Sequence, residues 1–344
     1  MQPMKQVYKD IFQIEVPLPG NPLKVLNAYL IKGGERNLLI DTGFNHPQCL
    51  EVLNEAMVQI GASWEQTDLL ITHLHADHSG LVSKLTGGKT RVFMSFKDGA
   101  LVNGLNRRGY WDQMEKLFCT HGMPKREEDL DKTRHPGEFF QSAKPFEVTE
   151  VGDGDRIEVG EYTFTVWITP GHSPEHVCLY EEDEKLFFSG DQILADITPV
   201  ITVEKGMDDP LTLFLQSLKR LTPIKVKLCL PAHRRLITDF QGAVCSLLDH
   251  HEQRLREVLA ILREAEGPMN AYEVAARMSW DMPPRVWEEV PRQQRWFATG
   301  EAMAHLIYLT KQGFLQEQRG AGGATYRKKG GSKIENFSFD QTVL

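Results

Sequence analysis

Three histidines and one aspartate lie within the run Thr72-His73-Leu74-His75-Ala76-Asp77-His78. Imidazole and carboxylate are the ligands that a borderline divalent metal prefers. With 12 His among 344 residues, the pattern His-x-His-x-Asp-His should arise by chance in about one such chain in a thousand. The run therefore predicts a metal site rather than a polar loop with incidental histidines.

The metal-binding run directly follows Leu69-Leu70-Ile71, an apolar stretch typical of a buried strand. In an extended loop, residues two apart point to the same side, so His73 and His75 can bind one ion. Asp77 and His78 lie at the start of the next element, where the chain turns. We therefore expect these two side chains to reach a second ion beside the first.

Two ions need more ligands than this loop provides, and three later segments offer them. His172, Asp191 and His233 each follow an apolar run and a turn residue. Strand ends deliver side chains from a rigid backbone into a cleft. We therefore expect these three residues to complete the site.

Apolar and alternating runs on both sides of the motif predict a mixed α/β domain with many short strands. Strands are expected at residues 11–16, 28–31, 37–40, 69–72, 91–95, 156–159, 162–168, 177–180, 185–189 and 226–230. Helices are expected at residues 48–60, 210–221 and 244–265.

Residues 97–145 differ in character, because they are rich in charged and aromatic side chains. We expect two helical pieces here, forming an insertion over one face of the core. Arg107, Arg108 and Tyr110 are candidate substrate-binding residues, since a lid that carries them would hold an anionic acyl group.

Gly267-Pro268 marks a predicted domain boundary. Helices at 271–278 and 300–311, followed by strands at 314–318 and 324–327 around a glycine-rich tip, have the outline of a winged helix. The expected domains are a catalytic domain at residues 1–266, a winged-helix-like domain at 267–330 and a tail at 331–344.

The composition is that of a globular protein, with 41% apolar and 25% charged residues. No apolar stretch is long enough to cross a membrane, and the N-terminus does not resemble a secretory signal. Five scattered cysteines without CxxC spacing indicate reduced thiols, so we expect a cytoplasmic protein with no membrane partner. The net charge of −8 argues against a long polyanion as the default partner, although residues 267–344 carry 10 basic and 8 acidic residues.

The ordered motifs resemble those of the metallo-β-lactamase-fold hydrolases over residues 10–265. Asp41, in Leu39-Ile40-Asp41-Thr42-Gly43, is similar to the first motif and the His73–His78 run to the second. His172, Asp191 and His233 are similar to the third, fourth and fifth. The resemblance implies a four-layer αβ/βα sandwich, and the segment after residue 267 resembles the winged-helix domain that some members append.

The same resemblance implies a role for each site residue. His73, His75 and His172 would bind the first metal, Asp77, His78 and His233 the second, and Asp191 would bridge both. Asp41 would lie beneath the metals as a supporting carboxylate. His176, four residues after His172, is expected to fix the orientation of a ligand.

Two closely spaced cations lower the pKa of a bridging water, so hydroxide exists near neutral pH and can act as the nucleophile. We therefore expect a dinuclear hydrolase in which Asp77 helps to orient the hydroxide. All expected ligands are nitrogen or oxygen donors, so zinc is favoured, with iron or manganese as alternatives.

The leading substrate hypothesis is a small thioester, ester or lactone, because the motifs resemble the glyoxalase II branch of the family. An alternative is an RNA phosphodiesterase, since some lactamase-fold proteins with a winged helix are endoribonucleases and Arg327-Lys328-Lys329 would meet phosphates. A third reading is a mononuclear iron enzyme of the persulfide dioxygenase type, which uses part of the same ligand set. A homodimer through the C-terminal segment is a further hypothesis.

The remaining histidines are expected to have no part in the site. His121, His135 and the pair His250-His251 are predicted to face solvent, and His305 to be a packing residue of an amphipathic helix.

Overall fold

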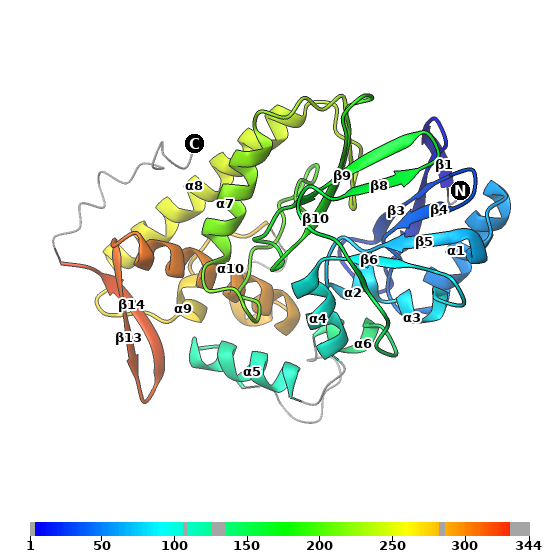
Figure 1. Ribbon diagram of the computed structural model, residues 1–344. Helices are drawn as coiled ribbons and strands as arrows, with labels where there is room; N and C mark the ends of the chain where they lie inside the picture. The colour runs from blue at the N-terminus through cyan, green and yellow to red at the C-terminus, as the bar shows by residue number, and fades with distance from the viewer. Residues whose placement is uncertain (1–3, 106–108, 126–134, 282–285, 331–344) are drawn as a thin grey trace. The chain divides into compact units, whose positions relative to one another are not determined.

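The computed structural model describes residues 4–105, 109–125, 135–281 and 286–330 (Figure 1). The chain forms two compact units. The N-terminal unit comprises residues 1–108, 136–199 and 224–243, and the C-terminal unit comprises residues 109–135, 200–223 and 244–344. The domain boundary expected at residue 266 stays a prediction.

The N-terminal unit contains a seven-stranded sheet in the order β1 to β7. Its strands are β1 (Met4–Tyr8), β2 (Ile11–Pro17), β3 (Val25–Ile31), β4 (Asn37–Ile40), β5 (Thr67–Leu70), β6 (Val92–Met94) and β7 (Thr149–Glu150). Strands β1 to β4 pair antiparallel, and β4 to β7 pair parallel. Both β4 and β5 are buried along their whole length, as is typical of parallel strands covered on both faces.

A second sheet of five strands has the order β12-β11-β10-β9-β8. Its strands are β8 (Arg156–Val159), β9 (Tyr162–Ile168), β10 (Val177–Glu181), β11 (Leu186–Gly190) and β12 (Leu228–Pro231). Only the β11–β12 pair is parallel among these described strands. Gly160 and Glu161 join β8 and β9 in a tight hairpin, as the sequence predicts.

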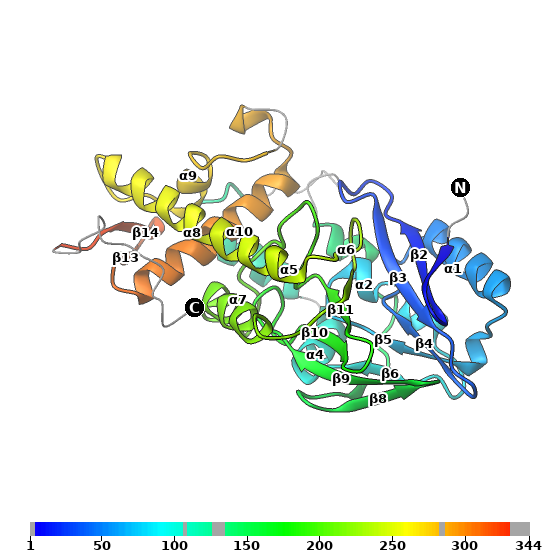
Figure 2. The same ribbon diagram turned by 90° about the horizontal axis from the view of Figure 1, so that it is seen from above.

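The two sheets share one apolar core. The rings of Tyr29 on β3 and Phe188 on β11 meet edge to face with centroids 5.3 Å apart, and Phe164 on β9 packs against the same Phe188 ring. Helix α1 (Pro47–Ile60) packs against β2, and the thiol of Cys49 donates a hydrogen bond to the Pro17 carbonyl (Figure 2). This arrangement confirms the predicted mixed α/β sandwich.

The other helices of the N-terminal unit are short. They are η1 (Trp64–Gln66), α2 (Ala76–Ser79), α3 (Val82–Leu85), α4 (Phe96–Leu105) and α6 (Pro136–Phe140). The segment expected as one insertion at residues 97–145 is divided between the units, because α5 (Tyr110–Thr120) belongs to the C-terminal unit. Its described part has three helices where we expected two.

The C-terminal unit is mainly helical. Besides α5 it contains α7 (Pro210–Leu221), α8 (Phe240–Glu264) from residue 244 onward, α9 (Ala271–Ala275), η3 (Trp287–Glu289), α10 (Arg292–Lys311) and the hairpin of β13 (Leu315–Gly320) and β14 (Gly323–Lys328). The described residues contain no helix long and apolar enough to span a bilayer. The likeness of this segment to a winged helix stays a prediction.

Two histidines expected at the surface are buried. His121 is 4% exposed, and its ring stacks on Tyr326 of β14. His251 is fully buried, and its Nδ1 lies 3.2 Å from Nε2 of His305 on α10. The sequence of α8 does not reveal this burial, because residues of other helices, Phe214 of α7 and His305 of α10, contact the His251 ring.

Candidate metal centre

The residues of the candidate site extend from strand ends of both sheets. Strand β5 ends at Leu70, and helix α2 begins at Ala76, so His73 and His75 lie in the loop between them. The second sheet supplies His172 after β9, Asp191 after β11 and His233 after β12. The structure thus brings together ligands from segments more than 150 residues apart in the sequence.

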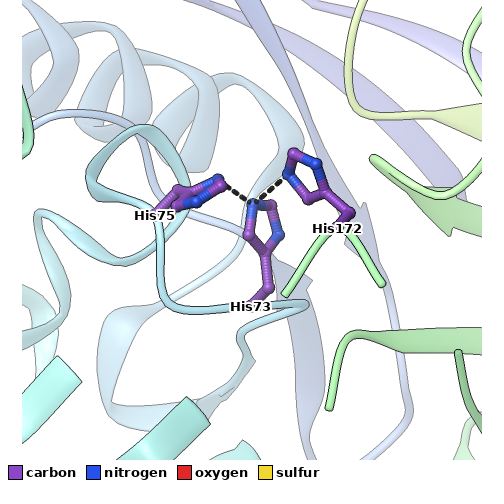
Figure 3. Close-up of side chains that lie close together, drawn as sticks. All are labelled: His73, His75 and His172. Atoms are coloured by element: carbon purple, nitrogen blue, oxygen red, sulfur yellow. Dashed lines mark hydrogen bonds between the residues drawn. The ribbon is translucent and has the colours of Figure 1, made fainter. Parts of the chain in front are cut away.

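Three imidazoles form the first group (Figure 3). His73 Nε2 lies 2.9 Å from His75 Nδ1 and 3.2 Å from His172 Nε2. A hydrogen bond between two rings needs a proton on one of the two nitrogens, so His73 Nε2 cannot satisfy both neighbours with lone pairs alone. A cation among the three nitrogens would satisfy every lone pair at once.

Asp77, His78 and His233 form the second group. Asp77 Oδ2 lies 3.7 Å from His78 Nε2 and 3.5 Å from His233 Nε2. Both histidines are buried, whereas the Asp77 side chain is 14% exposed. The group therefore offers one carboxylate oxygen and two imidazole nitrogens around a common point.

Asp191 lies between the two groups and turns one oxygen to each. Its Oδ2 is 3.6 Å from His172 Nε2, and its Oδ1 is 3.6 Å from His78 Nε2 and 3.5 Å from His233 Nε2. The Asp191 carboxylate therefore lies close to histidines of both groups.

The donor set fits divalent cations, because the buried polar atoms of the second group have no other partner. Among the described residues, His78 Nε2, His233 Nε2 and Asp191 Oδ1 are buried and form no hydrogen bond. Leaving such groups unsatisfied in the interior is costly. Nitrogen and oxygen ligands in these numbers suit zinc, and they also suit iron or manganese.

The other ring nitrogens are fixed by neighbours. His73 Nδ1 lies 3.0 Å from Thr72 Oγ1, His78 Nδ1 donates to Asp41 Oδ2 at 2.7 Å, and His233 Nδ1 donates to the Val25 carbonyl at 2.8 Å. These contacts hold each ring with its other nitrogen turned into the site.

Asp41 contacts both Thr72 and His78. Its Oδ1 accepts from the Thr72 amide at 2.9 Å, and its Oδ2 accepts from the Thr72 hydroxyl at 2.9 Å. Its φ of 61° is in the left-handed region, which Asp adopts more readily than most residues. The residue therefore supports the loop of His73 and the ring of His78 together.

His176 lies beside Asp191. Its Nε2 accepts a hydrogen bond from the Asp191 amide at 3.0 Å, so its Nδ1 carries the proton and faces Thr169 Oγ1 at 3.0 Å. Gly190, at φ 50°, allows this close approach, since a Cβ there would lie 2.5 Å from His176 Nε2. His176 therefore fixes the backbone that carries Asp191.

Burial and neighbouring charges shift the pKa values of the site residues in different directions. Burial lowers the pKa of His73, and the neighbouring His78 lowers it further, well below 6.5. Burial also lowers the pKa of His78, but the carboxylates around it, Asp41 first among them, raise it well above 6.5. Burial raises the pKa of Asp77, but His78 and His233 outweigh this and lower it to about 2. The Asp77 carboxylate is therefore ionised at neutral pH.

Comparison with known proteins identifies the family. Residues 23–89 and 105–233 match the metallo-beta-lactamase superfamily, and residues 255–329 match the metallo-beta-lactamase-like C-terminal domain. The chain belongs to the metallo-beta-lactamase superfamily. It is thus a hydrolase-type enzyme of a superfamily whose members typically bind metal ions, as the predicted family and fold implied.

Individual members of the superfamily show the same relationship. The probable metallo-hydrolase YqjP of Bacillus subtilis is 26% identical over 312 residues, which cover 88% of this chain and 92% of that protein. An atrochrysone carboxyl ACP thioesterase of Aspergillus novofumigatus is 27% identical over 263 residues, which cover 76% of this chain and 66% of the thioesterase.

A solved structure shares the fold of the present chain over nearly its whole length. A metallo-beta-lactamase family protein from Thermus thermophilus has a TM-score of 0.79 and 28% identity, with 94% of this chain and all of that chain covered. The similarity therefore extends over the C-terminal unit as well as the N-terminal one.

The predicted substrate contacts are less well defined than the metal ligands. Arg107 and Arg108 lie outside the described residues. Tyr110 begins α5 in the C-terminal unit, and its hydroxyl donates to Glu204 Oε2 at 2.7 Å. Its role toward a substrate stays a prediction.

Sequence reasoning missed residues that support the ligands of this metallo-beta-lactamase fold. Thr72 binds Asp41 and His73 together, and its place directly before the first histidine was the one signal that could have identified it. Asn27, inside β3, contacts the loop of His233, and no local pattern in the sequence distinguishes it from an ordinary strand residue.

Proposed function

We propose that the protein is a dinuclear metal-dependent hydrolase that acts on a thioester or a related small acyl substrate. The observation that carries the proposal is the position of Asp191, with Oδ2 toward His172 and Oδ1 toward His78 and His233. A carboxylate between two complete donor groups is expected where two cations share one ligand.

The ligand roles follow from the two groups. His73, His75 and His172 would hold the first ion, Asp77, His78 and His233 the second, and Asp191 would bind both. When bound, two divalent ions, with zinc favoured, would lower the pKa of water toward neutrality and polarise the acyl carbonyl.

The exposed side of the site is where water and substrate would enter. His75 and Asp77 are the partly exposed members of the set, whereas His73, His78 and His233 are buried. The Asp77 carboxylate, ionised at neutral pH, would accept a hydrogen bond from the attacking water and so orient it.

A thioester suits this donor set. Side chains that bind cations through their lone pairs hold no proton to give to a leaving group. An ordinary thiol has a pKa of about 8.5, so a thiolate leaves near neutral pH with little need of an acid. The similarity to ACP thioesterases supports the same substrate class.

RNA is the second candidate substrate, on one specific observation. Arg327, Lys328 and Lys329 are consecutive and exposed at the end of β14, where they would attract phosphates. A mononuclear iron enzyme is a third candidate, and it would leave the second donor group without a function.

Two measurements test the proposal. Metal analysis of the purified protein is expected to give two divalent ions per chain, and one iron per chain would instead support the persulfide dioxygenase type. A substrate panel would contain an N-acetylcysteamine thioester, a lactone, bis(p-nitrophenyl) phosphate and a short RNA. We expect turnover of the thioester and its loss in Asp191→Asn. Cleavage of RNA without any acyl turnover would reject the acyl substrate class.

The remaining expectations are also proposals. A homodimer and a cytoplasmic location rest on the sequence alone, and sizing of the purified protein by light scattering would test the first of them.

A further inference from the structure

The loop that carries His233 keeps one main-chain hydrogen bond to its own sheet, from the Ala232 amide to the Gly190 carbonyl of β11 at 3.0 Å. Strand β12 ends at Pro231, and Arg234 has a φ of 67°, in the left-handed region. A non-glycine residue in this region persists only where its surroundings hold it. The position of His233 therefore depends on contacts outside β12.

Strand β3 of the opposite sheet supplies several of these contacts: the Tyr29 hydroxyl donates to the Pro231 carbonyl at 2.8 Å, and Asn27 makes further ones. Its side-chain Nδ2 donates to the Pro231 carbonyl at 3.1 Å and to the Arg234 carbonyl at 2.8 Å. Its main-chain amide donates to the Ala232 carbonyl at 2.7 Å. One residue thus binds three carbonyls of the four-residue loop at 231–234.

The orientation of the Asn27 amide is settled by its surroundings. Two carbonyls face its Nδ2, and the Gln13 side chain on β2 donates to its Oδ1 at 2.8 Å. Asn27 and Gln13 are each 3% exposed. Because the Asn27 amide is buried and both donates and accepts hydrogen bonds, its orientation is fixed.

The same end of β3 also contacts the His233 ring. His233 Nδ1 donates to the Val25 carbonyl at 2.8 Å, so Nε2 faces Asp77 and Asp191. The β3 backbone therefore sets the tautomer of His233, and the Asn27 side chain sets the path of its main chain.

We propose that Asn27 is a positioning residue for the second metal-binding group, since it ties the His233 loop of one sheet to β3 of the other. The inference rests on the proposed two-ion function, but it concerns ion binding and needs no substrate. Residues that orient metal ligands typically change metal affinity by about 10–100-fold when they are replaced.

The test is a titration of metal-free protein with Zn²⁺ against a chromophoric chelator. Asn27→Asp keeps the shape but presents an acceptor to the Pro231 and Arg234 carbonyls, and Asn27→Ser removes the amide while leaving room for a water. Two reference variants provide comparison curves. His233→Ala removes a ligand of the second group, and His172→Ala removes a ligand of the first.

A matched control is Asn37→Asp. Asn37 is also a buried asparagine of the seven-stranded sheet, but it contacts Thr67 and Gly33 and no ligand loop. We expect the Asn37→Asp curve to match the wild type. Both Asn27 variants should bind the second ion about 10–100-fold more weakly, a change of the same kind as in His233→Ala but smaller, and should bind the first ion as the wild type does.

The outcomes are distinct. The proposal is overturned if a folded Asn27 variant binds both ions with wild-type affinity, or if it loses both groups in parallel. Should Asn27→Asp fail to fold, the Asn27→Ser curve decides between these results. A wild-type titration that saturates at one ion per chain would instead reject the two-ion function.

Discussion

Asp41 accepts a hydrogen bond from Nδ1 of His78 at 2.7 Å, and both side chains are almost completely buried. The same carboxylate accepts from the amide and hydroxyl of Thr72. One residue therefore connects the end of β4 to both ends of the metal-binding run, so its chemistry should affect the ligands without touching a cation.

Asp41→Asn should weaken metal binding while preserving the fold. Asn tolerates the left-handed conformation, so the backbone at φ 61° is retained. The neutral amide, however, stabilises the ring of His78 less than a carboxylate does. We expect activity and affinity for the second ion to fall about 10–100-fold, measured as kcat/KM and by metal titration. Wild-type values for both would contradict the role assigned to Asp41.

Gly190→Ala should damage the site through His176. An added Cβ would lie 2.5 Å from His176 Nε2 and 3.0 Å from Thr72 Cβ, at a φ of 50° that disfavours a side chain. We expect a loss of about 1–3 kcal/mol in the free energy of unfolding. We also expect a lower affinity for the metal ions that Asp191 would bind. Urea denaturation and metal analysis would show both.

A matched control is Gly61→Ala at the end of α1. Gly61 also has a positive φ, of 69°, but no atom of the described residues lies within 4 Å of the position that an added Cβ would take. This variant should lose stability through the backbone alone and keep its metal, whereas equal metal loss in both variants would rule out the contact with His176 as the cause.

Asp68→Asn should reduce stability without changing metal content. The Asp68 side chain is 3% exposed and accepts hydrogen bonds from the guanidinium groups of Arg36 and Arg91. Because Asp68 lies in β5 and the two arginines directly precede β4 and β6, these bonds hold the three neighbouring strands together. Burial raises the pKa of Asp68, but the hydrogen bonds from Arg36 and Arg91 outweigh it and hold the pKa below 3.8.

The sign of the pH effect follows from that lowered pKa. A carboxyl with a lower pKa in the folded state stabilises the protein above its unfolded pKa and loses this effect as the pH falls through the folded value. We expect a cost of about 1–3 kcal/mol for Asp68→Asn at neutral pH, shrinking below about pH 4. Denaturation curves with an unchanged difference at both pH values would refute this account.

The buried pair of His251 and His305 should make the protein acid-sensitive. Burial lowers the pKa of His251 well below 6.5, and the adjacent His305 lowers it further. The unfolded chain then binds more protons below pH 6.5, so stability falls as the pH drops. The loss attributable to His251 is about 1 kcal/mol at about pH 5.5.

His251→Leu isolates this effect from the titration of the metal ligands. Both proteins should be measured with their metals removed, by urea denaturation between about pH 5 and 8. The variant should show the shallower dependence on pH. Parallel curves for variant and wild type would exclude His251 as a source of acid sensitivity.

The sequence could predict the part of the site that is local or follows a strand. The run at residues 73–78 is recognisable because its ligands are close neighbours, and His172, Asp191 and His233 because each follows an apolar strand. Asn27 and His251 were not recognisable as buried polar groups with specific partners. Asn27 contacts a loop 204 residues away, and His251 contacts a helix residue 54 positions away.

The strands, too, could be predicted where the local sequence pattern is strong and could not where pairing partners decide. Long runs such as β2 and β9 were expected close to their observed bounds, because their apolar periodicity is strong, whereas β3 was expected to begin at residue 28 and begins at Val25. Strands β1 and β7 were missed, since each lies at an edge of the sheet and is largely exposed or partly buried. Their pairing partners, rather than their own side chains, make them strands.

The spacing of the ligands along the chain has a consequence for folding. Four of them lie between residues 73 and 78, but the others arrive only when the second sheet has formed and met the first. An unfolded chain therefore already offers His73 and His75 to a cation, and binding to that state opposes the stabilisation that the finished site provides. Refolding with excess Zn²⁺ present from the start should consequently be slower than refolding followed by metal addition, because the early-bound ion must be reorganised before distant strands close around it.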